Sequence, residues 1–171
     1  LLFTKDRHGN FLPSDGYPEL SLATGTVHDL PSFWSYWDQK DIDIRQTLKL
    51  YPRADWIGQM RHERYLDKLK LIERLMQEDL LPRDTDARRL AEAPLSDEVF
   101  VAAQRFIEKS SSLLMAIPLE DLFKQLELVN LPGVIDTYPC WKSKLPANIE
   151  NIRQLELFEV LFRKKTNSPN A

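Results

Sequence analysis

The chain has 171 residues, of which 43% are hydrophobic, with a formal net charge of -3 and an isoelectric point near 5.7. That length allows one domain with a hydrophobic core, and the slightly acidic balance lacks the basic character of a nucleic-acid-binding surface. No apolar stretch approaches the roughly 20 residues that span a bilayer, so we expect neither a nucleic-acid nor a membrane partner. The single cysteine, Cys140, excludes an internal disulfide and is typical of a reducing compartment, so we expect a cytoplasmic protein.

The first part of the chain is expected to alternate strands with a turn-rich connection. Residues 1–4 predict the end of a strand, and residues 5–17 contain many turn-forming residues, which indicates a surface connection. Residues 20–27 are apolar, small or β-branched, a pattern typical of a strand buried on both faces. Because the chain begins inside a predicted strand, we expect it to be the C-terminal part of a longer protein.

A titratable pair, His28-Asp29, follows the strand predicted for residues 20–27. In parallel α/β barrels the catalytic side chains sit at the C-terminal ends of the strands, which makes Asp29 a candidate functional carboxylate. Pro31 and Ser32 indicate that a helix begins here. An aspartate at this position is also an ordinary helix N-cap. The local residues favour the N-cap interpretation and leave the functional one open.

The short helix predicted for residues 31–37 is rich in aromatic side chains, namely Phe33, Trp34, Tyr36 and Trp37. These side chains could pack in the core, or they could form a platform for a flat ligand such as a sugar ring. Aromatic side chains dominate the energetics of protein cores, so core packing is the favoured interpretation.

Helices are expected to fill most of the remaining chain. Apolar residues at helical spacing predict a helix over residues 61–80, whose charged residues indicate a solvated face with local ion pairs. Ser96 is expected to cap a second helix over residues 96–117. Residues 119–124 predict a further helical turn, and residues 148–164 predict the last helix.

Residues 125–131 predict one more strand, because apolar positions first alternate and then run together. A loop over residues 134–146 follows. About three strands alternating with helices predict an α/β fold. So few parallel strands cannot close on themselves, so we expect residues 1–165 to form part of a single domain and residues 166–171 to form a flexible tail.

Several well-known catalytic motifs are missing from the sequence. It contains no glycine-rich phosphate loop, no nucleophile elbow and no paired cysteine or histidine spacing for a metal. The three histidines, His8, His28 and His62, are scattered. We therefore expect no metal site and no cofactor.

Three segments together resemble the 4-alpha-glucanotransferase (amylomaltase, or disproportionating enzyme) family. Residues 1–18 are similar to the family's strand and loop before its last carboxylate. Residues 27–32 read Val-His-Asp-Leu-Pro-Ser, where the family pattern is Thr-His-Asp-Leu-Pro-Thr. Residues 130–133 read Asn-Leu-Pro-Gly and residues 138–146 read Tyr-Pro-Cys-Trp-Lys-Ser-Lys-Leu-Pro. They resemble the family's Asn-x-Pro-Gly-Thr and Tyr-Pro-Asn-Trp-Arg-Arg-Lys-Leu.

The resemblance implies the C-terminal part of a (β/α)8 TIM barrel of the alpha-amylase clan. It implies an enzyme that cuts an alpha-1,4-glucan and passes the cut piece to another maltooligosaccharide with retention of configuration. Asp29 falls on the family's third catalytic aspartate and His28 on its substrate-binding neighbour, while Asn130 and Trp141 would line the active face.

Retaining chemistry needs two further carboxylates, a nucleophile and an acid/base, about 5 to 5.5 Å apart. The resemblance places both on earlier strands. The N-terminal remainder of the barrel is therefore an expected partner, and we expect the chain alone to be inactive.

The segments also depart from the family pattern, at Val27, Cys140, Lys142 and Ser143. Lysine in place of arginine replaces a bidentate guanidinium with a point charge. Two other functions stay open. One is a non-catalytic carbohydrate-binding remnant that uses the tryptophans, and the other is a helical interaction module built on residues 61–80 and 96–117.

Overall fold

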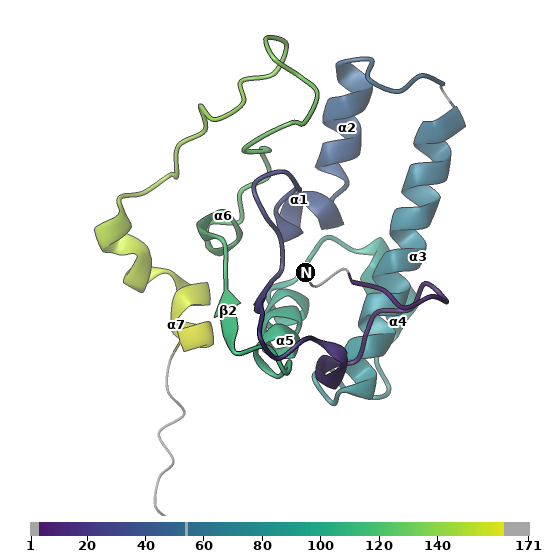
Figure 1. Ribbon diagram of the computed structural model, residues 1–171, viewed down its shortest axis with the longest axis vertical. Coiled ribbons are helices and arrows are strands. Elements are labelled where there is room, and N and C mark those ends of the chain that lie inside the picture. Colours follow the sequence, from purple (N-terminus) through teal and green to yellow (C-terminus); the bar gives the residue numbers. More distant parts are fainter. Residues whose placement is uncertain (1–3, 54, 163–171) are drawn as a thin grey trace, which may run out of the picture.

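The computed structural model describes residues 4–53 and 55–162, so the predictions for residues 1–3 and for the tail lie outside the described residues. Within these ranges the chain forms helices, two strands and short 3-10 turns (Figure 1). In chain order the elements are η1 (Ser14–Gly16), β1 (Leu22–Thr24), α1 (Phe33–Trp37), α2 (Lys40–Thr47), α3 (Asp55–Gln77), α4 (Ala87–Glu92), α5 (Asp97–Glu108), β2 (Leu114–Ala116), α6 (Leu119–Leu122), η2 (Ile149–Gln154) and α7 (Glu156–Phe162).

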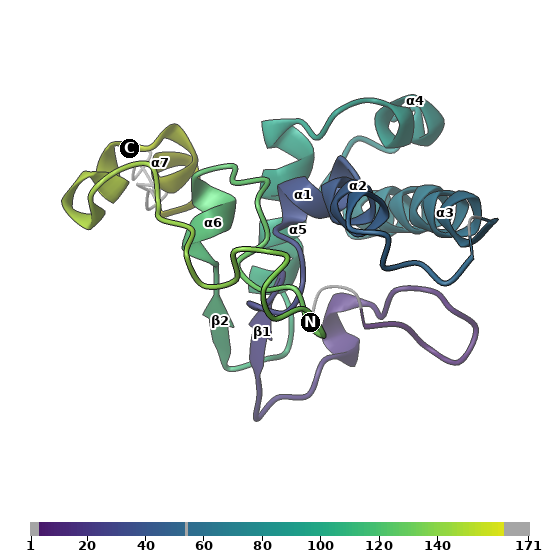
Figure 2. The ribbon, with the colours of Figure 1, turned by 90° about the horizontal axis from the view of Figure 1, so that it is seen from above.

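The two strands, β1 and β2, pair in parallel, with Ala23 opposite Met115. They lie between a group formed by α2, α3 and α4 on one side and α7 on the other, as two perpendicular views show (Figures 1 and 2). None of the helices in the described ranges is both long enough and apolar enough to cross a membrane.

Strand β1 confirms the strand predicted for residues 20–27 only in a shorter form, and the prediction that both its faces are buried holds at Ala23 and Thr24 but not at Leu20 and Leu22. Leu20 and Leu22 are 89% and 56% exposed, whereas Ala23 and Thr24 are buried. Successive residues of a strand point to opposite sides, so Ala23 and Thr24 are buried on opposite faces. Only the start of the strand, at Leu22, is left in solvent.

Strand β2 replaces the second half of the helix predicted for residues 96–117, which is wrong beyond Glu108. Ser96 caps α5 as expected, its hydroxyl accepting a hydrogen bond from the Val99 N–H. After α5 ends, the Leu113 and Leu114 N–H groups donate to carbonyls of the segment that leads into β1. A short apolar run suits a buried helix or a strand equally well, and the neighbouring β1 decides the outcome.

The strand predicted for residues 125–131 is wrong, because this segment is irregular. Its backbone groups find partners outside a sheet. The Tyr138 hydroxyl accepts a hydrogen bond from the Leu128 N–H and donates one to the Leu128 carbonyl, both at 3.0 Å. The Trp141 N–H donates to the Val129 carbonyl at 2.8 Å. Buried backbone groups need such partners, and the 134–146 loop supplies them.

Some predicted helices also change their bounds. Helix α3 begins at Asp55, earlier than the predicted start at residue 61, and ends at Gln77. The helix predicted over residues 148–164 is divided into η2 and α7 by Leu155, whose backbone is extended. Helix α6 confirms the helical turn expected at residues 119–124.

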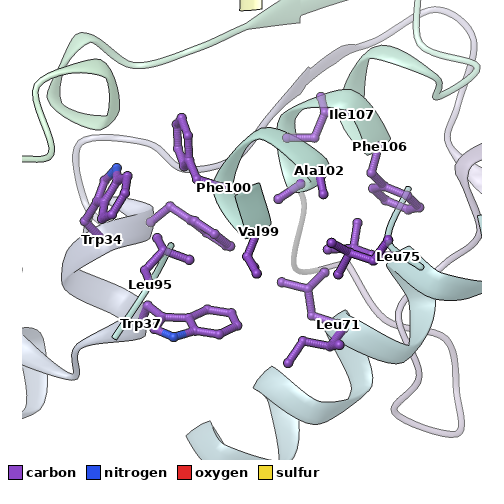
Figure 3. Close-up of a cluster of buried hydrophobic side chains, with 14 of the residues drawn as sticks. Trp34, Trp37, Leu71, Leu75, Leu95, Val99, Phe100, Ala102, Phe106 and Ile107 are labelled. Atoms are coloured by element: carbon purple, nitrogen blue, oxygen red, sulfur yellow. The ribbon is translucent and has the colours of Figure 1, made fainter. Parts of the chain in front are cut away.

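The hydrophobic core is built mainly from α1, α3 and α5, and Figure 3 shows their side chains meeting. Phe33, Trp34 and Trp37 of α1 are 0%, 7% and 1% exposed. The two indole N–H groups have carbonyl acceptors, since Trp37 Nε1 donates to Ala93 at 3.0 Å and Trp34 Nε1 donates to Asp121 at 2.9 Å. The core interpretation of these aromatics is confirmed, so Trp34 and Trp37 do not form a sugar platform.

The charged residues of α3 are not all solvated, which corrects the prediction for residues 61–80. Arg64 and Lys68 are buried. Arg64 forms a two-pronged ion pair with Asp41, and Lys68 Nζ donates to the Ala91 carbonyl at 3.1 Å. The apolar face of α3 and part of its charged face are therefore both packed, and α3 contacts α2 and α4.

Candidate functional site

The candidate residues that the sequence singles out lie together in space. Asn130 Nδ2 donates a hydrogen bond to Asp29 Oδ1 at 2.6 Å. His28 Nε2 lies 3.4 Å from the same oxygen. The ring of Trp141 lies against that of His28, with 5.1 Å between the ring centroids and an interplanar angle of 44°. We call Asp29, His28, Asn130 and Trp141 the Asp29 cluster.

The segment between β1 and α1 holds Asp29 in place. The Leu30 N–H donates to the Val27 carbonyl at 2.9 Å, which closes a turn around His28 and Asp29. The Thr26 hydroxyl donates to the Pro31 carbonyl at 2.7 Å. The segment therefore leaves β1, makes one tight turn and enters α1, with the two site residues at its tip.

Ser32 is the N-cap of α1, since its hydroxyl oxygen accepts a hydrogen bond from the Ser35 N–H at 3.0 Å. The N-cap interpretation of Asp29 is therefore wrong. The Asp29 carboxylate instead faces Asn130, whose amide comes from a segment 101 residues further along the chain.

Trp141 is held in an unusual backbone conformation. Its φ angle is 61°, in the left-handed region, where a bulky residue is uncommon and the conformation typically costs about 1–3 kcal/mol. The hydrogen bond from the Trp141 N–H to the Val129 carbonyl fixes this conformation. The side chain gains little burial in return, because Trp141 is 63% exposed. Trp141 therefore holds its exposed ring next to His28 in a strained backbone conformation.

A buried carboxylate contacts the start of α1 and was not singled out from the sequence. Asp121 of α6 has no exposed surface, and its Oδ1 accepts a hydrogen bond from the Phe33 N–H at 2.6 Å. This bond ties α6 to the first residue of α1, directly after the segment that carries Asp29. Burial raises the pKa of Asp121 to about 7, and the Phe33 N–H opposes the rise by favouring the charged form. No sequence signal distinguishes Asp121 from its neighbour Glu120, since both are acidic residues in the first turn of a helix.

The Asp29 cluster is open to solvent on this chain. The side chains of His28 and Asp29 are 57% and 50% exposed. The cluster offers a carboxylate, an amide, an imidazole and an aromatic face, a set that suits hydroxyl groups and the apolar face of a sugar ring. Among the described residues, no group of three or more His, Cys, Asp and Glu side chains could hold a metal ion.

The chain is similar to proteins of known function. A sequence profile described as 4-alpha-glucanotransferase matches residues 1–150. A 4-alpha-glucanotransferase from Haemophilus influenzae is 28% identical over 162 residues, which cover 95% of this chain and 23% of that protein. One from Mycobacterium bovis is 26% identical over 182 residues, which cover 99% of this chain and 24% of that protein. The chain thus spans about a quarter of the length of these relatives.

A crystal structure of amylomaltase from Corynebacterium glutamicum has a similar fold, with a TM-score of 0.78 and 22% sequence identity. The matched region covers 89% of this chain and 22% of that chain. The structural likeness concerns the fold alone, whereas the profile match extends over most of the sequence. The chain therefore belongs to the 4-alpha-glucanotransferase family.

Proposed function

We propose that the protein containing this chain is a 4-alpha-glucanotransferase that transfers alpha-1,4-glucan segments between maltooligosaccharides with retention of configuration. Residues 1–165 form the C-terminal segment of its (β/α)8 barrel domain, and the protein acts in the cytoplasm. Asp29 serves as the third catalytic aspartate, and His28, Asn130 and Trp141 bind the glucan. The observation that carries the proposal is the Asp29 cluster itself, in which residues from two distant segments meet around one carboxylate oxygen.

The geometry around Asp29 supports this assignment. Its Oδ1 is already engaged by Asn130 and His28, which leaves Oδ2 to accept hydrogen bonds from sugar hydroxyls. The fixed negative charge favours the positively charged, oxocarbenium-like state through which glycosidic bonds break. The exposed Trp141 ring offers an apolar face on which a sugar ring can stack.

The nucleophile and the acid/base are assigned to the part of the protein that precedes this chain. Asp41 is not available for either role, because it is buried in its ion pair with Arg64. The parallel strands β1 and β2 also leave an apolar face in solvent at Leu22 and Leu114, as expected if neighbouring strands belong to the remainder of the barrel.

The test is Asp29→Asn in the full-length enzyme, with disproportionation of maltotriose as the assay. Loss of a charge that acts mainly in the transition state should lower kcat by about 10²–10³-fold. Asp136→Asn is the matched control, because Asp136 is an exposed aspartate of the 134–146 loop outside the cluster. Undiminished turnover by Asp29→Asn, in an active full-length enzyme, would refute the catalytic assignment.

A second measurement concerns the chain by itself. Because the two other carboxylates are assigned elsewhere, the 171-residue chain should show no transferase activity toward maltotriose. Detectable disproportionation by the pure chain would contradict the proposal, whereas recovery of activity only in the full-length enzyme would support it.

A further inference from the structure

The segment from Gly25 to Phe33, which carries His28 and Asp29, has one buried carboxylate beside both of its ends. Asp121 Oδ1 accepts a hydrogen bond from the N–H of Phe33, the first residue of α1, at 2.6 Å. The other oxygen, Oδ2, lies by the opposite end, since a methyl group on Gly25 would be 3.9 Å from it. Asp121 therefore adjoins the segment where it leaves β1 and where it enters α1, and Asp29 lies midway between these points in the sequence.

The chain that follows Asp121 holds the rest of this segment. The backbone carbonyl of Gln125 accepts a hydrogen bond from the hydroxyl of Ser32, the residue before α1. Asn130 Nδ2 donates to Asp29 Oδ1 at 2.6 Å. One stretch of chain thus contacts the segment at its ends and at the Asp29 carboxylate itself, and Asp121 is the buried end of that stretch.

Stability alone gives little reason for a carboxylate at this place. Asp121 has no exposed surface, and within residues 4–53 and 55–162 its Oδ2 has no hydrogen-bond partner. Gln104, which is equally buried, also borders Gly25, and both of its amide atoms lack partners in the same ranges. Burying polar atoms without partners is costly and offsets much of the gain from the hydrogen bond to Phe33. What the carboxylate supplies instead is a fixed position for the start of α1.

We propose that Asp121 is a positioning residue, which fixes the ends of the segment from Gly25 to Phe33 and so holds the Asp29 carboxylate where it acts on the glucan. The inference rests on the proposed function, because it takes Asp29 to be catalytic. Asp121 itself is fully buried and does not touch the glucan. The alternative is a purely structural role, in which Asp121 only satisfies one of the free N–H groups at the start of α1.

The test compares Asp121→Leu with Asp121→Asn in the full-length enzyme, with disproportionation of maltotriose as the assay. Leucine removes the acceptor at similar volume, so kcat should fall about tenfold or more, because a displacement of about 1 Å can cost about 10²-fold. The KM should stay within about threefold, since the residues assigned to glucan binding are unchanged. Asparagine keeps an oxygen acceptor for the Phe33 N–H and should restore kcat to within about threefold of the wild type.

Glu78→Met is the matched control. Glu78 is likewise a carboxylate that holds a backbone N–H, that of Ser14, at 3.0 Å, and Ser14 belongs to η1, outside the segment that carries Asp29. Its kcat should stay within about threefold of the wild type. Should the leucine variant fail to fold, Asp121→Ser gives the same comparison, because its hydroxyl is one atom short of the carboxylate oxygens.

A double-mutant cycle separates positioning from a general loss of structure. In the background of Asp29→Asn, Asp121→Leu should lower the remaining kcat by less than about twofold, because the charge that it positions is already gone. A general loss of structure would lower kcat by the same factor in both backgrounds.

The outcomes distinguish the two proposals. Suppose that Asp29→Asn inactivates the enzyme. A folded Asp121→Leu variant with the kcat of the wild type then overturns the positioning role alone. Equal losses for the leucine and asparagine variants, or equal factors in the two backgrounds, overturn it as well. A full-length wild type without transferase activity, or one that Asp29→Asn leaves fully active, overturns the proposed function and the positioning role with it.

Discussion

Replacing Asp121 with asparagine should remove a large part of the pH dependence of stability. The Asp121 side chain has no exposed surface, and its Oδ2 has no hydrogen-bond partner among the described residues. Asparagine keeps an oxygen acceptor for the Phe33 N–H and cannot ionise. It also places N–H donors near Gln104, whose amide atoms have no hydrogen-bond partner within residues 4–53 and 55–162. Both Gln104 and Asp121 Oδ2 border Gly25.

The sign follows from the direction of the pKa shift. Burial raises the pKa of Asp121 from 3.8 to about 7, so the folded state binds the proton more tightly than the unfolded state. The stability associated with this proton is fully present below pH 3.8 and is lost as the pH rises through about 7. The whole shift corresponds to about 4 kcal/mol of unfolding free energy. About 2.5 kcal/mol of this falls between about pH 5 and about pH 8.

The assay is urea unfolding of wild type and Asp121→Asn at these two pH values. On going from the lower to the higher pH, the unfolding free energy of the variant should rise by about 2.5 kcal/mol relative to that of the wild type. Asp136→Asn, at an exposed loop position, should follow the wild type at both. Parallel pH profiles for wild type and Asp121→Asn would refute the inference that the buried Asp121 carboxylate titrates near neutral pH.

Three other perturbations test separate parts of the structure. Arg64→Met should lower the unfolding free energy by about 3–5 kcal/mol, because it leaves Asp41 buried without its partner. Arg83→Met breaks an exposed ion pair with Asp79 and should lower the unfolding free energy by only about 0–1 kcal/mol. Equal losses for the two variants in urea unfolding would contradict this difference between buried and exposed ion pairs. Trp141→Ala should leave the melting temperature of the full-length enzyme unchanged or slightly raised, because Trp141 is exposed and its backbone is strained. The same variant should have a higher KM for maltoheptaose. A loss of stability at unchanged KM would assign Trp141 a structural role. Leu114→Ser should increase the monomer fraction of the isolated chain on size-exclusion chromatography, because Leu114 is 65% exposed on β2, and an unchanged elution profile would speak against association through this face.

The sequence alone predicted the features that depend on local chemistry. Ser96 was placed at the start of a helix, because a capping hydroxyl acts on N–H groups within three residues. The aromatic residues of α1 were assigned to the core for their size and apolar surface. The resemblance to the family singled out Asp29, His28, Asn130 and Trp141, and the fold brings these four together, although their roles remain proposals.

Tertiary structure decided the features that depend on distant partners. Residues 114–116 form a strand because β1 lies beside them, and residues 125–131 do not because a loop satisfies their backbone groups. The burial of Arg64 and Asp121 also depends on partners that only folding supplies, Asp41 and the Phe33 N–H. The chemistry of a side chain follows from its residue type. Whether a backbone group or a charge is buried and paired depends on which segments of the folded chain contact it.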